Sequence, residues 1–234
     1  MVYGIVVAGG QGTRIGFRKQ FAMLRGKPVW RRSVEALLAG GVVKIWLAAP
    51  AEDVERLQSE VRQGPLSDRL RIVAGGASRF ASVRNALTAL LDECGSGECP
   101  SHVAVHDAAR PFVLPRDVAS VIAAAKDHGG AILATPSPDT VKSVQDGRIV
   151  ATIPRDGVWL AETPQVFATA WMKQRYFEVD LGEMFTDDAS LFEDDAHSVR
   201  IVPATGYNRK ITTPDDWAYA TWLAEQRWGG EGSE

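Results

Sequence analysis

The chain has 234 residues, a formal net charge of −3 and a pI near 5.9. This slightly acidic balance argues against a nucleic-acid-binding surface, which would be basic. No apolar stretch approaches the roughly 20 residues that a membrane-spanning helix requires. Because the chain enters an apolar strand at once, without a charged leader, we expect a cytoplasmic protein. Its ordinary globular composition predicts one domain over residues 1–234.

The first predicted element is a buried strand that runs into a glycine-rich turn. Residues 3–8 form a continuous apolar run, which is typical of a strand buried on both faces. Three glycines follow within four positions: Gly9, Gly10 and Gly12. Without Cβ atoms they allow backbone N–H groups to approach an anion, and Arg14 and Lys19 add two cations there. This pattern predicts a phosphate-binding loop, with a simple strand–helix turn as the alternative.

Strands and helices alternate along most of the remaining chain. Strands are predicted at residues 42–48, 70–73, 103–105, 130–135, 162–167 and 199–202. Helices are predicted at residues 28–39, 52–62, 80–91, 116–126 and 214–225. This alternation predicts an α/β fold with a doubly wound, mostly parallel sheet. Right-handed crossovers place the strand-to-helix loops on one edge, so the loops at Gly9, Gly75 and Asp107 should converge.

A second glycine turn, Gly75-Gly76, precedes the helix predicted at residues 80–91. One interpretation is a helix start capped by Ser78. The other is a nucleobase site, in which backbone carbonyls near Gly76 and the Ser82 hydroxyl bind the edge of the base.

Asp107 follows the buried strand at residues 103–105. A carboxylate at the end of a central strand is costly to bury unless it is paired or bound to a cation. Asp107 could form an ion pair with Arg110, or it could hold Mg²⁺ that bridges phosphate oxygens.

Residues 138–156 interrupt the alternation with two β-rich segments around Asp146-Gly147, a type I′ turn signal. Four of their apolar side chains are too many for a solvated hairpin: Val141, Val144, Ile149 and Ile153. We therefore predict a projecting arm that packs into a second subunit, with a decorative flap as the alternative.

The cysteines and histidines do not suggest a metal centre. Cys94 and Cys99 lie in a glycine-containing loop, without further thiols or histidines at zinc-binding spacing. We expect free thiols, with an optional disulfide as the alternative. The four histidines are scattered along the sequence.

Six motifs, in the same order, resemble those of the 2-C-methyl-D-erythritol 4-phosphate cytidylyltransferase family. They are A-G-G-x-G-T-R with K-Q (8–20), G-G-x-x-R-x-x-S-V (75–83), H-D-A-A-R-P (106–111), T-P-Q-x-F (163–167), T-D-D-A-S (186–190) and N-x-K-I-T-x-P-D-D (208–216). The chain departs from the usual pattern at Arg18, where the family commonly has Pro, and the Arg14-to-Lys19 interval is shorter.

The resemblance implies a Rossmann-like nucleotidyltransferase fold and a homodimer formed through the 138–156 arm. It implies transfer of a cytidylyl group from CTP to 2-C-methyl-D-erythritol 4-phosphate, assisted by Mg²⁺ or another divalent cation, with release of pyrophosphate. Such chemistry depends on positioning and charge neutralisation, so no nucleophilic Ser, Cys or His is expected. Two alternatives remain: a ribitol-5-phosphate cytidylyltransferase, against which H-D-A-A-R-P argues, and a non-catalytic nucleotide-binding homologue.

The resemblance also implies a role for individual residues. The catalytic cations are Arg14, Lys19 and Lys210. The CTP-binding residues are Ala8, Gly9, Gly10, Gly12, Gly76, Ser82 and Asp107, and Asp107 is also the metal ligand. Residues that bind methylerythritol phosphate are Arg110, Thr140, Arg155, Thr186 and Lys210. Thr140 and Arg155 would reach the site of the partner subunit.

Overall fold

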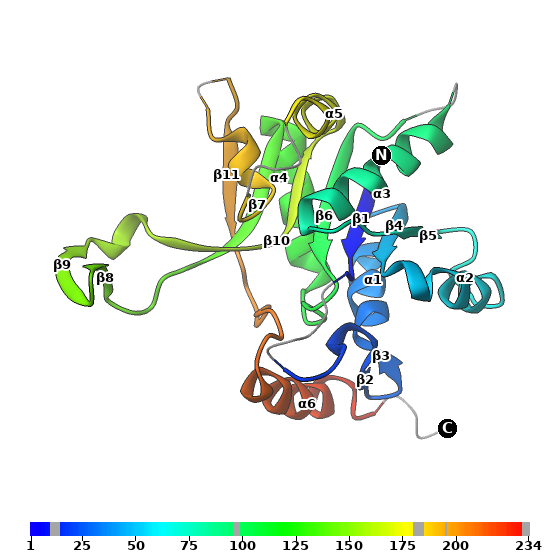
Figure 1. Ribbon diagram of the computed structural model, residues 1–234, viewed down its shortest axis with the longest axis horizontal. Coiled ribbons are helices and arrows are strands. Elements are labelled where there is room, and N and C mark those ends of the chain that lie inside the picture. The colour runs from blue at the N-terminus through cyan, green and yellow to red at the C-terminus, as the bar shows by residue number, and fades with distance from the viewer. Residues whose placement is uncertain (10–14, 96–98, 180–184, 195, 231–234) are drawn as a thin grey trace.

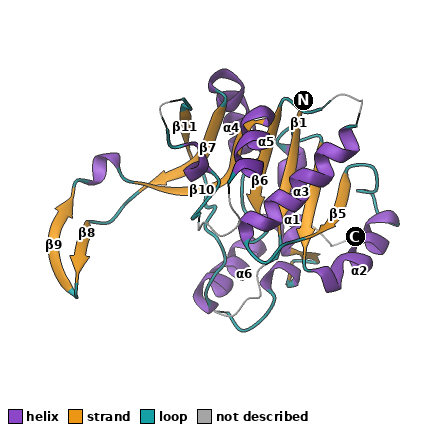
Figure 2. Ribbon diagram, turned by 45° about the horizontal axis from the view of Figure 1, so that its top comes forward, coloured by secondary structure: helices purple, strands orange, loops and turns teal. Residues whose placement is uncertain are grey.

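A seven-stranded sheet forms the centre of the molecule in a computed structural model that describes residues 1–9, 15–95, 99–179, 185–194 and 196–230 (Figures 1 and 2). Its strands are β1 (Val2–Val7), β4 (Lys44–Ala49), β5 (Leu70–Ala74), β6 (His102–Asp107), β7 (Gly130–Pro136), β10 (Trp159–Ala168) and β11 (Val199–Pro203). The strand order is β11-β7-β10-β6-β1-β4-β5. All neighbouring strands are parallel except β10, which is antiparallel to both β6 and β7. The predicted mostly parallel α/β sheet is confirmed.

Helices cover both faces of this sheet. They are α1 (Val29–Ala39), α2 (Val54–Arg62), α3 (Arg79–Cys94), α4 (Pro115–His128), α5 (Thr169–Glu178) and α6 (Pro214–Trp228). Strand side chains alternate between the faces: Ile45 and Leu47 of β4 pack into one core with α1, α2 and α4, whereas Trp46 packs into a second core with α3 and α5. Helix α6 packs on a third, smaller cluster that includes Phe112. This arrangement confirms the doubly wound prediction.

Most predicted boundaries lie within three residues of those observed. Ser78 caps α3 by accepting a hydrogen bond from the Ala81 amide, and Thr213 forms a capping box with Asp216 at the start of α6. The helix predicted from residue 52 begins instead with the 3₁₀ turn Ala51–Asp53. Cys94 and Cys99 are free thiols. Among the described helices, none is both long and apolar enough to cross a membrane.

The predicted arm is present as a hairpin outside the main sheet. Strands β8 (Val141–Gln145) and β9 (Arg148–Ile153) pair only with each other and project from the body (Figure 1). Asp146 and Gly147 have φ values of 48° and 77°, which fits the type I′ turn expected between them. The side chains of Val144, Ile149 and Val150 are 57%, 67% and 62% exposed. The hairpin thus presents an apolar surface that its own chain does not cover.

The carboxyl ends of the parallel strands bring the candidate site together. Gly9 follows β1, Pro50 follows β4, Gly75 follows β5 and Asp107 ends β6. Because β10 runs in the opposite direction, it begins at this same edge. Its early residues, including Thr163, therefore lie beside the end of β6.

Candidate active site

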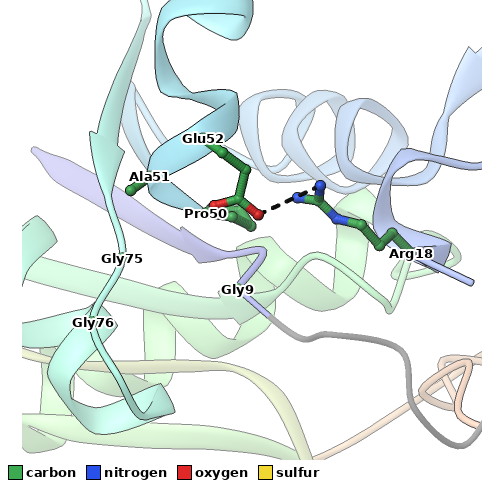
Figure 3. Close-up of a pocket in the computed structure, with 7 residues that line it drawn as sticks. All are labelled: Gly9, Arg18, Pro50, Ala51, Glu52, Gly75 and Gly76. Carbon is green, nitrogen blue, oxygen red and sulfur yellow. Dashed lines mark ion pairs between the residues drawn. The ribbon is translucent and has the colours of Figure 1, made fainter.

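A pocket of about 460 Å³ opens where β1, β4 and β5 end (Figure 3). It is lined by Gly9, Arg18, Pro50, Ala51, Glu52, Gly75 and Gly76. The predicted convergence of the Gly9 and Gly75 loops is therefore confirmed. The strand ends supply mostly backbone to this pocket, and Arg18 and Glu52 supply its charged side chains.

Ser82 lies next to Gly9, Gly75 and Gly76. Its hydroxyl accepts a hydrogen bond from the Gly76 amide at 3.0 Å and donates to the Ser78 carbonyl at 2.8 Å. A Cβ atom added to Gly75 would lie 3.0 Å from this hydroxyl, and one added to Gly9 would lie 3.6 Å from it. The absence of a side chain at Gly75 thus allows the close approach of Ser82, and Gly9 lies nearby. Direct contact between Ser82 and a nucleobase stays a prediction.

Asp107 lies at the centre of a cluster of cations. Lys210 Nζ is 2.9 Å from its Oδ2, Arg79 Nε is 3.1 Å from its Oδ1, and Arg110 Nε is 3.6 Å from its Oδ2. Burial alone would raise the pKa of this carboxyl, but the three neighbouring cations outweigh burial and hold the pKa well below its usual range. Asp107 is therefore ionised, and the predicted pair with Arg110 belongs to a larger cluster.

Arg79 connects this cluster to a second buried carboxylate. Its guanidinium donates two hydrogen bonds to Asp188, at 2.9 Å and 2.7 Å, while its Nε donates to Asp107. The Tyr176 hydroxyl also donates to Asp188, whose side chain is 0% exposed. Arg79 therefore holds the start of α3, the end of β6 and the segment after Thr186 in one arrangement. Arg79 and Asp188 lie in separate sequence motifs, and neither motif predicted a role for them.

His106 and Thr163 fix the backbone on either side of Asp107. The Arg110 carbonyl can only accept, so His106 Nε2 donates to it at 3.1 Å. The Thr163 hydroxyl then donates to His106 Nδ1 at 2.9 Å and accepts from the Asp107 amide at 3.1 Å. Burial lowers the pKa of His106 to about 4, in agreement with this neutral form. His106 and Thr163 each belong to a sequence motif, but the motifs did not predict the hydrogen bond between them.

The segment that carries Lys210 is anchored to β10. The Asn208 side-chain amide donates to Glu162 Oε2 at 2.8 Å and to the Thr163 carbonyl at 2.9 Å. Arg110 donates to the Asn208 carbonyl at 2.9 Å. These contacts explain how a loop before α6 brings Lys210 to Asp107.

The other predicted site residues that the structure describes lie in the 3₁₀ turn around Lys19, close to Asp188, and at the arm. Lys19 is nearly buried in the 3₁₀ turn Lys19–Phe21, and Gln20 ties this turn to the end of β1 through the Ala8 carbonyl at 2.9 Å. Thr186 is exposed, close in sequence to Asp188. Gly10, Gly12 and Arg14 lie outside the described residues.

Thr140 and Arg155 are exposed and lie with the arm, where Arg155 donates to the Pro138 carbonyl at 2.8 Å. Because the arm projects from the body (Figure 1), the single chain does not assemble these two residues with the Asp107 cluster.

Asp107 is the predicted ligand for Mg²⁺, and its two carboxylate oxygens are already paired with Arg79, Arg110 and Lys210. Within the described ranges no group of three or more His, Cys, Asp or Glu residues could hold a metal ion. Mg²⁺ commonly binds through one or two carboxylates while water and phosphate oxygens fill its other positions. One ionised carboxylate at the sheet edge suits that arrangement, and does not suit a cation held by protein groups alone.

A mostly parallel sheet with glycines, an ionised carboxylate and several cations at its carboxyl edge is typical of an α/β nucleotide-binding protein. A family model described as IspD, 2-C-methyl-D-erythritol 4-phosphate cytidylyltransferase, matches residues 2–226. The enzyme of that name from Geobacter metallireducens is 37% identical over 225 residues, which cover 94% of this chain and 95% of the relative.

Solved structures are similar to this chain over nearly its whole length. The 4-diphosphocytidyl-2C-methyl-D-erythritol synthase from Anaerococcus prevotii has a TM-score of 0.81 at 26% identity, covering 96% of this chain and 98% of its own. The 2-C-methyl-D-erythritol 4-phosphate cytidylyltransferase from Thermus thermophilus has a TM-score of 0.75 at 28% identity, covering 96% and 100%. This chain belongs to the 2-C-methyl-D-erythritol 4-phosphate cytidylyltransferase family.

Proposed function

We propose that this chain transfers the cytidylyl group of CTP to 2-C-methyl-D-erythritol 4-phosphate, which yields 4-diphosphocytidyl-2-C-methyl-D-erythritol and pyrophosphate. The cluster in which Arg79, Arg110 and Lys210 surround Asp107 is the observation that carries this proposal. It lies at the same sheet edge as the pocket lined by Gly9 and Gly76. The family match and the H-D-A-A-R-P string favour methylerythritol phosphate over ribitol phosphate as the acceptor.

In this reaction an oxygen of the acceptor phosphate attacks the α-phosphorus of CTP in line, and pyrophosphate leaves. The protein has to bring two anionic substrates together and to stabilise charge on the phosphoryl oxygens. Lys210 and Arg110 are fixed by their contacts with Asp107 and Asn208, so they are oriented before substrate binds. Lys19, with Arg14, would bind the triphosphate from the turn that follows β1.

We propose Mg²⁺ as the cofactor, held on the protein side by Asp107. When bound, it would neutralise part of the charge on the phosphate oxygens. The cations around Asp107 keep that carboxylate ionised, and Arg79 and Lys210 fix its orientation. We also propose that the protein acts in the cytoplasm.

We propose a homodimer in which each arm packs on the other subunit. The exposed apolar side chains of Val144, Ile149 and Val150 support this, because so much uncovered apolar surface on a two-stranded hairpin is unfavourable in water. Thr140 and Arg155, at the two ends of the hairpin, would then contribute to the acceptor site of the partner.

Pyrophosphate release tests the proposed reaction. The chain should release pyrophosphate from CTP with methylerythritol phosphate, and not with ribitol 5-phosphate. Chelation of divalent cations should abolish the release, and Mg²⁺ should restore it. Faster turnover with ribitol 5-phosphate would overturn the acceptor assignment, and binding of CTP without turnover of either acceptor would favour a non-catalytic homologue.

A further inference from the structure

Besides Gly9, Gly75 and Gly76, the pocket is lined by two charged side chains, Arg18 and Glu52, which form one of its walls. Arg18 reaches it from the turn before Lys19, and Glu52 reaches it from the connection between β4 and α2. Figure 3 shows the two side chains pointing toward each other, with Arg18 Nη1 at 3.6 Å from Glu52 Oε1. The Glu52 side chain is 69% exposed and Arg18 is 38% exposed. An exposed ion pair of this length contributes little stability, so it can exchange for contacts with a ligand.

Two residues outside the pocket lining, Asp53 and Phe21, hold Arg18 in place. It forms an ion pair with Asp53, whose side chain is 11% exposed, and its guanidinium lies 4.7 Å from the centre of the Phe21 ring. Arg56 contacts the same two groups, at 3.0 Å from Asp53 and 5.4 Å from the Phe21 ring. Arg56 is absent from the residues that line the pocket. The two arginines therefore share their supports and differ in whether they face the pocket.

Charge differs between the two ends of the site. Beside Arg18, the two cations Arg18 and Arg56 are paired with three carboxylates, those of Glu52, Asp53 and Glu60, so positive charge is not in excess there. In the cluster around Asp107, the cations Arg79, Arg110 and Lys210 exceed the carboxylates Asp107 and Asp188 by one. The phosphates of a nucleotide favour the end with excess positive charge, so its uncharged base belongs at the end beside Arg18.

We propose that Arg18 and Glu52 form the outer wall of the nucleobase subsite. The planar guanidinium of Arg18 would pack on the base, as arginine does on unstacked nucleobases. The Glu52 carboxylate would accept a hydrogen bond from the exocyclic amino group of cytosine. In uracil a carbonyl oxygen replaces this amino group and would face the carboxylate unfavourably. The proposal rests on the proposed function for the identity of the nucleotide.

Calorimetric binding of CTP, without the second substrate, tests the role of Arg18. Arg18→Ala should raise the Kd for CTP about tenfold, the size of one lost charged contact. The affinity of Arg18→Ala for pyrophosphate, measured in the same way, should stay within about twofold of wild type, because pyrophosphate has no base. Arg56→Ala is the matched control, and it should bind CTP normally although it loses contacts with the same Asp53 and Phe21.

Glu52→Gln tests base recognition separately. It should lower the preference for CTP over UTP about tenfold, since an uncharged amide can also donate to the uracil carbonyl. Three results would overturn the proposal: normal CTP affinity in Arg18→Ala, an equal loss in Arg56→Ala, or a parallel loss of pyrophosphate affinity. Because these measurements need only nucleotide binding, failure of the proposed transfer reaction would be seen separately.

Discussion

Around Asp107, charged side chains from several segments of one chain hold one another, whereas the arm leaves its apolar side chains without cover from its own chain. Asp188 and Tyr176 are fully buried, and Asp188 accepts hydrogen bonds from both Arg79 and Tyr176, while Ile149 is 67% exposed. The first region needs nothing from outside to keep its geometry. The second pairs its two strands with each other but leaves apolar side chains in water, so its role depends on another surface. Substitutions should therefore affect folding and chemistry in the first region, and assembly or the shared acceptor site in the second.

The largest effect on folding is expected from Arg79→Met. This change leaves the carboxylate of Asp188 buried without its bidentate partner, which costs about 3–5 kcal/mol. Urea denaturation measures the loss. Arg84→Met on the same helix is the control, because Arg84 only lies over the Phe177 ring, at 5.6 Å, and should cost about 1 kcal/mol or less. Equal losses in the two variants would show that Asp188 does not depend on Arg79.

The next effect concerns catalysis. Asp107→Asn keeps the shape of the side chain but removes the charge that Arg79, Arg110 and Lys210 surround. We expect kcat/KM for CTP to fall roughly 10²–10³-fold, the scale of losing a preorganised electrostatic contact. Pyrophosphate release gives the rate, with Asp215→Asn on the exposed start of α6 as the control. Activity within a few fold of wild type would remove Asp107 from the chemistry.

These contacts mark the limit of prediction from the sequence. Strands and helices were predictable because apolar periodicity and caps such as Ser78 and Thr213 are local signals. The convergence of Gly9 and Gly75 followed from the handedness of the crossovers. The ion pair between Arg79 and Asp188 could not be predicted in this way, because 109 residues separate the two side chains and no local pattern links them.

The same limit applies to single side chains at the site. The sequence indicated that Asp107 needs a cation, but it did not show that three would share the carboxylate. Likewise, the Ser82 hydroxyl was expected at the nucleobase, and its bonds to Gly76 and Ser78 depend on how two turns close in space. Packing in three dimensions decides such partners, so motif strings alone cannot assign them.

A third effect should appear as a dependence of stability on pH. Burial lowers the pKa of His106 to about 4, whereas an unfolded chain has a histidine pKa near 6.5. Between these values the unfolded chain binds a proton that the folded chain does not. The stabilisation from neutral His106 is therefore complete above about pH 6.5 and decreases by ~3 kcal/mol as pH falls to about 4. Denaturation of wild type and of His106→Gln across this range gives the difference. Parallel curves would contradict a buried neutral His106.

The smallest effect on folding is expected at the arm. Arg155→Ala should leave the free energy of unfolding within about 0.5 kcal/mol of wild type, because Arg155 is exposed. It should raise KM for methylerythritol phosphate about tenfold while KM for CTP stays unchanged, since the guanidinium would bind only the acceptor phosphate. Arg148→Ala, which changes another exposed cation of the arm, should alter neither constant.

Mixing two defective chains then shows whether the site is shared. If Arg155 serves the partner while Lys19 serves its own subunit, a heterodimer of Arg155→Ala and Lys19→Ala chains carries both changes in one site. Its other site is intact, so at acceptor concentrations well below KM, where each variant alone is weakly active, mixing should restore up to half of the wild-type activity per heterodimer. Sedimentation must show that the subunits exchange. Exchange without recovery would place Arg155 in the site of its own chain, and an active wild-type monomer would show that the arm is not needed for catalysis. Recovery in the mixture, with unchanged unfolding of each variant, would establish that the arm acts through assembly, in contrast to the self-contained cluster around Asp107.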